Sequence, residues 1–393
     1  MTVRWIDDVR ARAERDRPPA TAPGPPGSPG SAGDVTRVVL RCPDGLGPAR
    51  DVAGVLARPA ESVAPAVVLL HGGGGRAEPR WARDWAARGH VALALDLGAA
   101  RAAGGARRPA RLDHDDIFAA VAEHSWLAQA TEAAADAVSL LRALPGVDPR
   151  AVGVCGVSWG GYLAFLLAAA DPRLRYAVGV YAAGQLARDG AWSALLGDLP
   201  AAVSHRWTDA FDLAGHAPSI AAPSLWLTGT TDPCFPLDAF DATSALPAGP
   251  VTRRIVPGLE HGHEPAWRLA EPFAFASSVL GRGPALPAVG AACVTAGGVR
   301  AELGPAAPVL AAELHHTGDT GAWTSRRWQR RTAMIDGTTV RADVPAGGFS
   351  AAFLSVQGPA GTSTTGLLTG CDAGTGRGTK GEPLCSVAGN RTW

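Results

Sequence analysis

Short apolar runs alternate with longer stretches of helical spacing through the middle of the chain. The apolar runs, which predict strands, cover residues 66–70, 91–96, 151–155, 176–182, 223–229 and 252–256. The stretches between them, which predict helices, cover residues 79–88, 117–144, 160–170, 237–245 and 266–279. Apolar strands that alternate with helices are typical of a mostly parallel sheet covered by helices on both faces. The pattern therefore predicts an α/β fold over residues 34–283, which opens with two further strands at 35–42 and 52–58.

The pattern changes on both sides of this region. Residues 1–17 predict a short charged helix, and residues 17–33 form a Pro-, Gly- and Ser-rich linker that cannot build a packed element. After Gly283, short alternating strands separated by Gly, Asp and Pro turns predict a small all-β sandwich over residues 284–370. The predicted division is an N-terminal segment (1–33), an α/β domain (34–283), a β-sandwich domain (284–370) and an irregular tail (371–393).

Composition and charge narrow the range of functions. A content of 47% apolar and 18% charged residues supports a large folded core. The formal net charge is zero, so the charge balance favours neither a nucleic acid nor an anionic membrane as a partner. The N-terminal sequence has no apolar run, and no stretch is long and apolar enough to span a bilayer. We expect a cytoplasmic protein without a signal peptide.

The six cysteines show neither a C-x-x-C pair nor a zinc-ligand spacing. Cys42, Cys155 and Cys293 lie in apolar, strand-like surroundings and are expected to be small core residues. Cys371 and Cys385 flank a Gly-rich segment and could pair in an oxidising compartment, although two free thiols are favoured. We expect neither a metal ion nor a cofactor.

One serine lies in a pattern that is typical of catalysis. Residues 156–160 read Gly-Val-Ser-Trp-Gly, which matches G-x-S-x-G, and they lie between a predicted strand and a predicted helix. Hydrolases hold a nucleophilic serine on a sharp turn at this position. The alternative is that the small residues only allow close packing of the helix on the strand. A five-residue match alone would favour that alternative, so the interpretation depends on the rest of the chain.

A glycine-rich loop follows the strand at 66–70 and reads His71-Gly72-Gly73-Gly74-Gly75. Such a loop can direct backbone N–H groups at one point, as stabilisation of an oxyanion requires. A phosphate-binding loop is excluded, because neither G-K-[ST] nor the G-x-G-x-x-G spacing is present. A plain flexible turn is the remaining alternative, and we interpret His71 as a structural residue at the end of the strand.

Two later strands end close to further candidates. Asp232 comes just after the strand at 223–229, where open α/β sheets place ligand sites, although an Asp before Pro233 can also simply form a turn. His261 and His263 lie in a loop after the last strand of the α/β region. The order Ser158, Asp232, His261 is the order that α/β-hydrolases use for nucleophile, acid and base.

Other clusters carry less weight. Asp238 and Asp241 fall within the helix pattern that follows, and residues 111–118 hold three acids and a histidine that more often cap a helix than bind a metal. His315 and His316 are adjacent in a β-rich region and are expected to point to opposite faces. Four tryptophans could stack on a sugar, but packing is favoured for most of them: Trp126, Trp192, Trp207 and Trp267.

Residues 66–96, 153–181, 225–240 and 260–267 together resemble an α/β-hydrolase of the dienelactone hydrolase and acetyl xylan esterase type. The likeness extends through residues 316–356, which resemble the β-sandwich of a bacterial subgroup of these esterases. It implies Ser158 as the nucleophile, Asp232 as the acid and His261 as the base. Backbone N–H groups of the oxyanion hole would come from Trp159 and from the segment Gly72–Gly74, with Gly73 and Gly74 as its donors.

The resemblance further implies a carboxylic ester hydrolase that works through an acyl-enzyme, with a small-molecule or carbohydrate ester as substrate and an acetylated carbohydrate as the first candidate. One rival is a serine peptidase of the prolyl oligopeptidase type, which shares G-x-S-x-G-G. The other is a non-catalytic scaffold whose β-sandwich binds a partner or a glycan.

We expect His261, not His263, to be the base. His261 comes first after the strand and the turn, and Gly262 lets the chain bend away behind it. His263 is expected to help start the helix at Ala266, which is a structural role.

Overall fold

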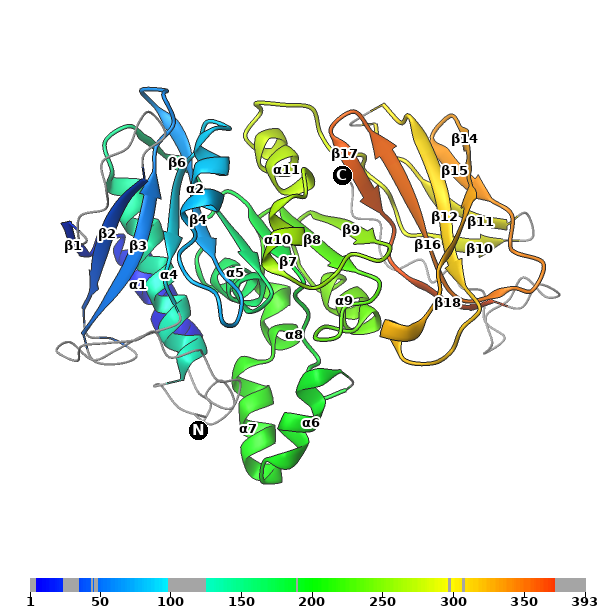
Figure 1. Ribbon diagram of the computed structural model, residues 1–393, viewed down its shortest axis with the longest axis horizontal. Helices are drawn as coiled ribbons and strands as arrows, with labels where there is room; N and C mark the ends of the chain where they lie inside the picture. The colour runs from blue at the N-terminus through cyan, green and yellow to red at the C-terminus, as the bar shows by residue number, and fades with distance from the viewer. Residues whose placement is uncertain are drawn as a thin grey trace.

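The computed structural model describes residues 5–23, 35–43, 45, 49–97, 125–188, 190–295, 298–305 and 308–371. Within this part of the chain, a central sheet flanked by helices is followed by a β-rich domain (Figure 1). No described helix has the length and apolar character that crossing a bilayer would need. The architecture confirms the predicted α/β fold with a β-sandwich after it.

The α/β domain contains the following strands: β1 (Ala20–Pro23), β2 (Val35–Cys42), β3 (Arg50–Ala57), β4 (Ala64–Leu70), β5 (Val91–Leu95), β6 (Val147–Val157), β7 (Ala177–Val180), β8 (Ser224–Gly229) and β9 (Val251–Val256). Its helices are α1 (Trp5–Arg15), α2 (Pro79–Ala86), α4 (Trp126–Ala143), α5 (Trp159–Ala170), α6 (Ala191–Asp198), α7 (Ala201–Phe211), α8 (Leu213–His216), α9 (Leu237–Ser244), α10 (His263–Trp267) and α11 (Glu271–Val279).

The strands of this domain lie in the order β1-β2-β3-β5-β4-β6-β7-β8-β9. The six strands from β5 to β9 along this order are parallel, whereas β1, β2 and β3 pair antiparallel. Every residue of β4, β5, β7 and β8 is buried, which explains why these strands read as uninterrupted apolar runs. Because parallel strands all point the same way, the segments that follow β4, β6, β7, β8 and β9 emerge at one edge of the sheet.

Two groups of helices pack around the sheet. Helices α1, α4 and α5 contact one another, and α4 and α5 lie against β6. Helices α2, α10 and α11 form a second group, in which Trp81 stacks on Trp267 at 5.8 Å and Trp85 contacts Phe273 at 4.6 Å. The sheet is thus enclosed by layers whose apolar side chains form one continuous core.

The β domain has two antiparallel sheets with a core of their own. The first contains β12 (Ala311–Thr317), β13 (Gln329–Thr332), β16 (Phe349–Gly358), β17 (Gly361–Thr364) and β18 (Leu368–Cys371). The second contains β10 (Cys293–Thr295), β11 (Gly298–Glu302), β14 (Met334–Asp336) and β15 (Thr339–Ala342). Apolar side chains between the sheets form the second core, among them Val299, Leu314, Val340 and Leu354.

The two domains share one sheet, a feature that the sequence pattern did not predict. Strand β17 pairs with β9 at Thr364 and Arg253, so the larger β-domain sheet continues the central sheet. The Ile255 N–H donates to the Thr364 hydroxyl at 3.1 Å. Phe353 of β16 is fully buried and belongs to the core of the α/β domain. The β domain is therefore packed directly against the edge strand β9.

The N-terminal segment differs from the prediction. Residues 5–15 form the expected helix, but Trp5 and Val9 are fully buried in the core of the α/β domain. The prediction that residues 17–33 build no packed element is wrong at Ala20–Pro23, which form strand β1 paired with β2. The prediction failed there because it treated residues 17–33 as one uniform segment. Pro and Gly predominate only from residue 23 onward.

Two helical regions also differ. The helix predicted over 266–279 is two helices, α10 and α11, because Pro272 cannot continue a helix and instead lies in the first turn of α11. Helices α6 and α7 were not predicted and project from the edge of the sheet between β7 and β8 (Figure 1). Residues 117–124 of the predicted helix 117–144, and the acidic cluster at 111–118, lie outside the described residues.

A buried ion-pair network attaches α1 to α4. The Arg12 guanidinium donates to both Asp136 oxygens, at 2.6 and 2.9 Å, and to Glu132 at 2.6 Å. Arg50 of β3 also reaches Glu132, at 3.1 Å. The side chains of Arg12, Glu132 and Asp136 are each less than a tenth exposed. Charges held away from water in this way depend on their partners.

We predict that Arg12→Met destabilises the protein by about 3 kcal/mol, because it leaves buried carboxylates without their main cation. Urea unfolding followed by tryptophan fluorescence measures the change. Arg15→Met is the matched control, since Arg15 is exposed on the same helix. Equal unfolding midpoints for the two variants would contradict a structural role for the network.

Candidate active site

Ser158 lies at the turn between β6 and α5, in a conformation that few residues adopt. Its backbone angles are φ 56° and ψ −125°, outside the regions that L-residues favour. Glycine is required on both sides of it by close backbone contacts. A Cβ on Gly156 would lie 2.0 Å from the Gly160 carbonyl oxygen, and one on Gly160 would lie 2.0 Å from the Leu70 carbonyl oxygen. The G-x-S-x-G pattern therefore holds Ser158 at the end of β6 by packing β4, β6 and α5 tightly together.

Ser158, His261 and Asp232 form one hydrogen-bonded row. His261 Nε2 lies 2.9 Å from Ser158 Oγ, and His261 Nδ1 lies 3.0 Å from both oxygens of Asp232. A carboxylate can only accept at these distances, so Nδ1 donates and Nε2 accepts from the serine hydroxyl. The row is partly shielded: the Asp232 side chain is fully buried and that of His261 is 17% exposed.

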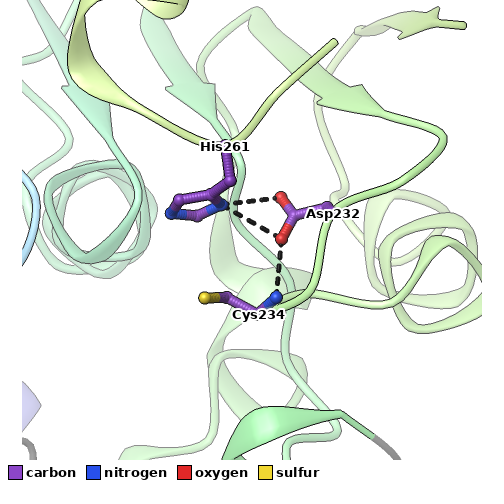
Figure 2. A group of neighbouring side chains, drawn as sticks. All are labelled: Asp232, Cys234 and His261. Carbon is purple, nitrogen blue, oxygen red and sulfur yellow. Dashed lines mark hydrogen bonds and ion pairs between the residues drawn. The ribbon is translucent and has the colours of Figure 1, made fainter. Parts of the chain in front are cut away.

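Asp232 is oriented by the loop that follows β8 (Figure 2). One of its oxygens accepts from the backbone N–H groups of Cys234 at 2.8 Å and Phe235 at 2.9 Å. Asp238 and Asp241, the weaker candidates, lie on helix α9 as expected. Asp241 accepts from the Leu367 N–H at 2.7 Å and so contacts the β domain instead of His261.

Tyr181 supports the loop that carries His261, and the sequence analysis missed it. Its hydroxyl donates to the Glu260 carbonyl oxygen at 2.7 Å, and its ring centroid lies 4.6 Å from that of His261. Burial, with the nearby charges of Asp232 and Glu260, raises the pKa of Tyr181, so the hydroxyl stays protonated and keeps donating. The sequence offered one signal for Tyr181. It directly follows β7, the strand that pairs with β6.

The glycine-rich loop after β4 is held by two histidines. His71 Nε2 accepts from the Leu97 N–H at 2.9 Å while its Nδ1 donates to the Gly72 carbonyl oxygen at 2.7 Å. This confirms the structural role predicted for His71. His263 Nε2 accepts from the Gly72 N–H at 2.9 Å. Burial lowers the pKa of His263, as does the proximity of His71 and His261, which favours the neutral ring that can accept.

The backbone N–H groups predicted to stabilise the oxyanion therefore differ in whether they already donate to another group. Gly72 lies against the serine, since a Cβ there would come within 2.9 Å of Ser158 Cβ, but its N–H is engaged by His263. The N–H groups of Gly73 and Gly74 donate to no other described residue, and Gly74 has φ +68° in the turn that the Gly75 N–H closes onto the Gly72 carbonyl. Trp159 directly follows Ser158 and is the first residue of α5.

Aromatic side chains gather beside the serine. Trp159 contacts Trp192 of α6 at 5.0 Å and Phe235 at 5.9 Å between ring centroids. Phe235 in turn stacks on the His261 ring at 6.2 Å. Trp192 and Trp207 are buried, as the packing interpretation of these residues predicted. The unpredicted helix α6 therefore packs, through Trp192, against the residue that follows Ser158.

Asp232, Cys234 and His261 have potential metal-ligand atoms within 4.8 Å of one another (Figure 2). The carboxylate and the imidazole Nδ1 already satisfy each other in the hydrogen-bonded row. Burial and the Asp232 charge raise the pKa of the Cys234 thiol to about 12, whereas a metal ligand must be a thiolate. The donor set fits the hydrogen-bonded row better than a metal centre.

The remaining candidates lie away from this row. His315 and His316 are on β12 of the β domain. Trp267 of α10 stacks beside His263 at 5.5 Å, and the Trp126 indole donates to the Leu97 carbonyl oxygen at 2.8 Å. Cys42 and Cys155 are buried, as predicted, whereas Cys293, also predicted to be a core residue, is only partly buried on β10.

The strand order, with candidate residues after β4, β6, β8 and β9, defines an α/β-hydrolase fold. Residues 52–262, more than half of the chain, match the dienelactone hydrolase family, and the chain belongs to that family. Membership of this family places the protein among the hydrolases. A comparison with curated proteins finds no match.

Solved structures support the same fold. The acetyl xylan esterase from Paenibacillus sp. R4 is similar with a TM-score of 0.57 and 20% identity, over 70% of this chain and 93% of that chain. Acetyl xylan esterase 1 from Thermoanaerobacterium sp. JW/SL YS485 is similar with a TM-score of 0.54 and 19% identity, over 66% and 89%. At this identity the likeness concerns the fold.

We predict that His263→Ala loosens the glycine-rich loop, because the Gly72 N–H loses its acceptor. A hydrogen bond contributes about 1 kcal/mol, so amide exchange at Gly72 is expected to rise several-fold. Hydrogen–deuterium exchange of peptides covering residues 69–76 measures it. His205→Ala on the exposed face of α7 is the control. Unchanged exchange in His263→Ala would show that other contacts hold the loop.

Proposed function

We propose that the protein is a serine carboxylic ester hydrolase that works through an acyl-enzyme. The observation that carries the proposal is the hydrogen-bonded row of Ser158, His261 and Asp232, which starts at a strained strand-to-helix turn. A structural serine has no need of a histidine at 2.9 Å whose other nitrogen is held by a fully buried carboxylate. A non-catalytic scaffold would not require this arrangement.

In the first half of the reaction, Ser158 Oγ attacks the ester carbonyl carbon while its proton passes to His261 Nε2. Asp232 keeps Nδ1 protonated and stabilises the imidazolium that results. The tetrahedral intermediate collapses when its C–O bond to the alcohol breaks, and His261 returns the proton to the departing alkoxide. The acyl group then remains on Ser158.

In the second half, His261 Nε2 takes a proton from a water molecule that attacks the acyl carbon. Collapse of the second tetrahedral intermediate releases the carboxylic acid, and His261 returns the proton to Ser158 Oγ. The negative oxygen that forms in each half is stabilised by the N–H groups of Trp159, Gly73 and Gly74. Gly72 is assigned a different role, because its N–H donates to His263 and fixes the loop.

We assign a small ester as the substrate, with an acetylated carbohydrate as the leading candidate. Phe235 packs against the His261 ring and belongs to a buried aromatic cluster with Trp159 and Trp192, which supports a compact acyl group. The carbohydrate part rests on the fold likeness to two acetyl xylan esterases. Action on small molecules, without a nucleic acid, membrane or cofactor, and a cytoplasmic location stay predictions from the sequence.

Ser158→Ala is expected to abolish hydrolysis of p-nitrophenyl acetate, with a loss on the order of a million-fold in kcat. The same variant should lose labelling by a fluorophosphonate probe, which reacts with activated serines. The near-neighbour Ser193→Ala, on exposed helix α6, is the control and should label normally. Labelling or turnover that survives in Ser158→Ala would refute the proposed nucleophile.

His261→Gln is expected to slow single-turnover acylation by about a thousand-fold or more, because it removes the base that activates Ser158. His263→Gln should cost less than about tenfold, since it weakens one hydrogen bond to the loop. The comparison uses a stopped-flow burst of p-nitrophenol. If His263→Gln is the slower enzyme, the assignment of the base to His261 is wrong.

A further inference from the structure

A cavity of about 540 Å³ lies where the β domain meets the end of strand β9, apart from the row that contains Ser158. Its walls come from β9, β12, β13, β16 and β17, so both domains contribute to it. Figure 1 shows β9, β17, β16 and β12 next to one another in the shared sheet. We call it the junction cavity. Its volume falls within the range of about 300 to 1,000 Å³ that is usual for small-molecule sites.

The cavity lies on the outer face of the larger β-domain sheet. Along β12, Leu314 belongs to the core between the two β-domain sheets, whereas the side chains of Glu313 and His315 line the cavity. Ser355 is the partner of Glu313 on β16 and lines it as well. Alternate residues of a strand face opposite sides of a sheet, so polar residues here form a continuous surface. The strands thus present polar side chains to the cavity, where apolar side chains could have filled the space.

Each charge at the cavity is already paired. Arg254 Nε donates to Glu271 at 3.1 Å, and Arg330 donates to Glu313 at 3.3 Å. Burial lowers the pKa of His315 to about 4, so this ring is neutral at pH 7, and its Nε2 lies 3.0 Å from the Ser355 hydroxyl. Among the described residues, the cationic and anionic side chains at the cavity are thus paired with one another, so the lining does not favour an anionic or a cationic ligand over a neutral one.

Neutral polar side chains line the cavity beside the charged ones. The Trp328 indole N–H is buried and has no hydrogen-bond partner among the described residues. The side-chain amides of Gln329 and Gln357 and the Thr362 hydroxyl also line the cavity, and they offer both donors and acceptors. These groups match a ligand that is itself rich in neutral donors and acceptors.

An aromatic row runs beside these groups. His315 stacks on Phe353 with ring centroids 4.9 Å apart, and Phe353 contacts Trp328 at 5.2 Å. Phe353 is fully buried, so it supports the other two rings from below. The cavity thus combines the ring of Trp328 with neutral amides and hydroxyls, which are the groups that bind the faces and hydroxyls of a sugar ring.

We propose that the junction cavity binds a neutral sugar, a mono- or disaccharide, with Trp328 as its main aromatic contact and Gln329 and Gln357 as hydrogen-bonding partners. The inference is independent of the proposed esterase function, because none of these residues belongs to the row of Ser158, His261 and Asp232. It assigns to the β domain a second site, which holds carbohydrate without cleaving it.

The test measures binding to the full-length Ser158→Ala protein, in which turnover cannot interfere. Isothermal titration with xylobiose, cellobiose and maltose should give saturable binding of at least one sugar, with Kd below about 10 mM, a range in which binding is weak but measurable. Trp328→Ala and Gln329→Ala, each added to Ser158→Ala, should weaken that binding at least about tenfold. Gln329 lies on an exposed edge strand. Its variant therefore tests the sugar site even if loss of the Trp328 side chain disturbs folding.

Trp323→Ala is the matched control, since Trp323 is five residues earlier in the same segment, under the Arg326 guanidinium, and does not line the cavity. It should leave sugar binding unchanged. The proposal is overturned if none of the three sugars binds, if the Trp328 and Gln329 variants bind as tightly as their parent, or if inorganic phosphate competes for the site. If the wild-type protein hydrolyses no ester, that result bears only on the proposed function and not on the sugar site.

Discussion

The close approach of helix α5 to strands β4 and β6 is the constraint on which the candidate site depends. A single Cβ at position 160 would meet the Leu70 carbonyl oxygen at 2.0 Å, so the helix can sit at this depth only with glycine there. At this depth the Gly72 backbone comes against Ser158, and the chain enters the helix through the strained angles of Ser158. The packing of the core therefore sets the position of the hydroxyl.

The parallel sheet then brings the other groups to the same place. Loops after β7, β8 and β9 carry Tyr181, Asp232 and His261, and each of these side chains is fixed by hydrogen bonds and not by packing alone. His263 ties the loop after β9 to the loop after β4 through the Gly72 N–H. One short stretch, residues 260–263, thereby connects the serine, the acid and the glycine-rich loop. A displacement of this stretch would alter all three at once.

Much of this could be predicted from the sequence, because the relevant signals are local. The buried strands are apolar throughout, and the pattern around Ser158, the glycines after His71 and the order of Asp232 and His261 all lie within short segments.

What was missed depends on contacts between distant segments. Trp5 is buried in the core, and its indole donates to the Ala210 carbonyl oxygen, 205 residues away. Nothing in a charged N-terminal segment signals this contact. The engagement of Gly72 by His263 spans 191 residues and is equally invisible in a single sequence. Helices α6 and α7 were missed because they carry few buried residues.

The pairing of β17 with β9 also determines how the sheet ends. An α/β sheet that stopped at β9 would present unpaired backbone groups, to which a strand of another molecule could add. Here the β domain occupies that edge, and the sheet ends instead at β13, a short strand whose four residues, Gln329–Thr332, are all exposed and include two arginines. The opposite end is β1, a four-residue strand that finishes in proline, which cannot donate to a further strand. Short, charged or proline-ended strands at both limits oppose edge-to-edge association, so the β domain contributes to keeping separate molecules apart.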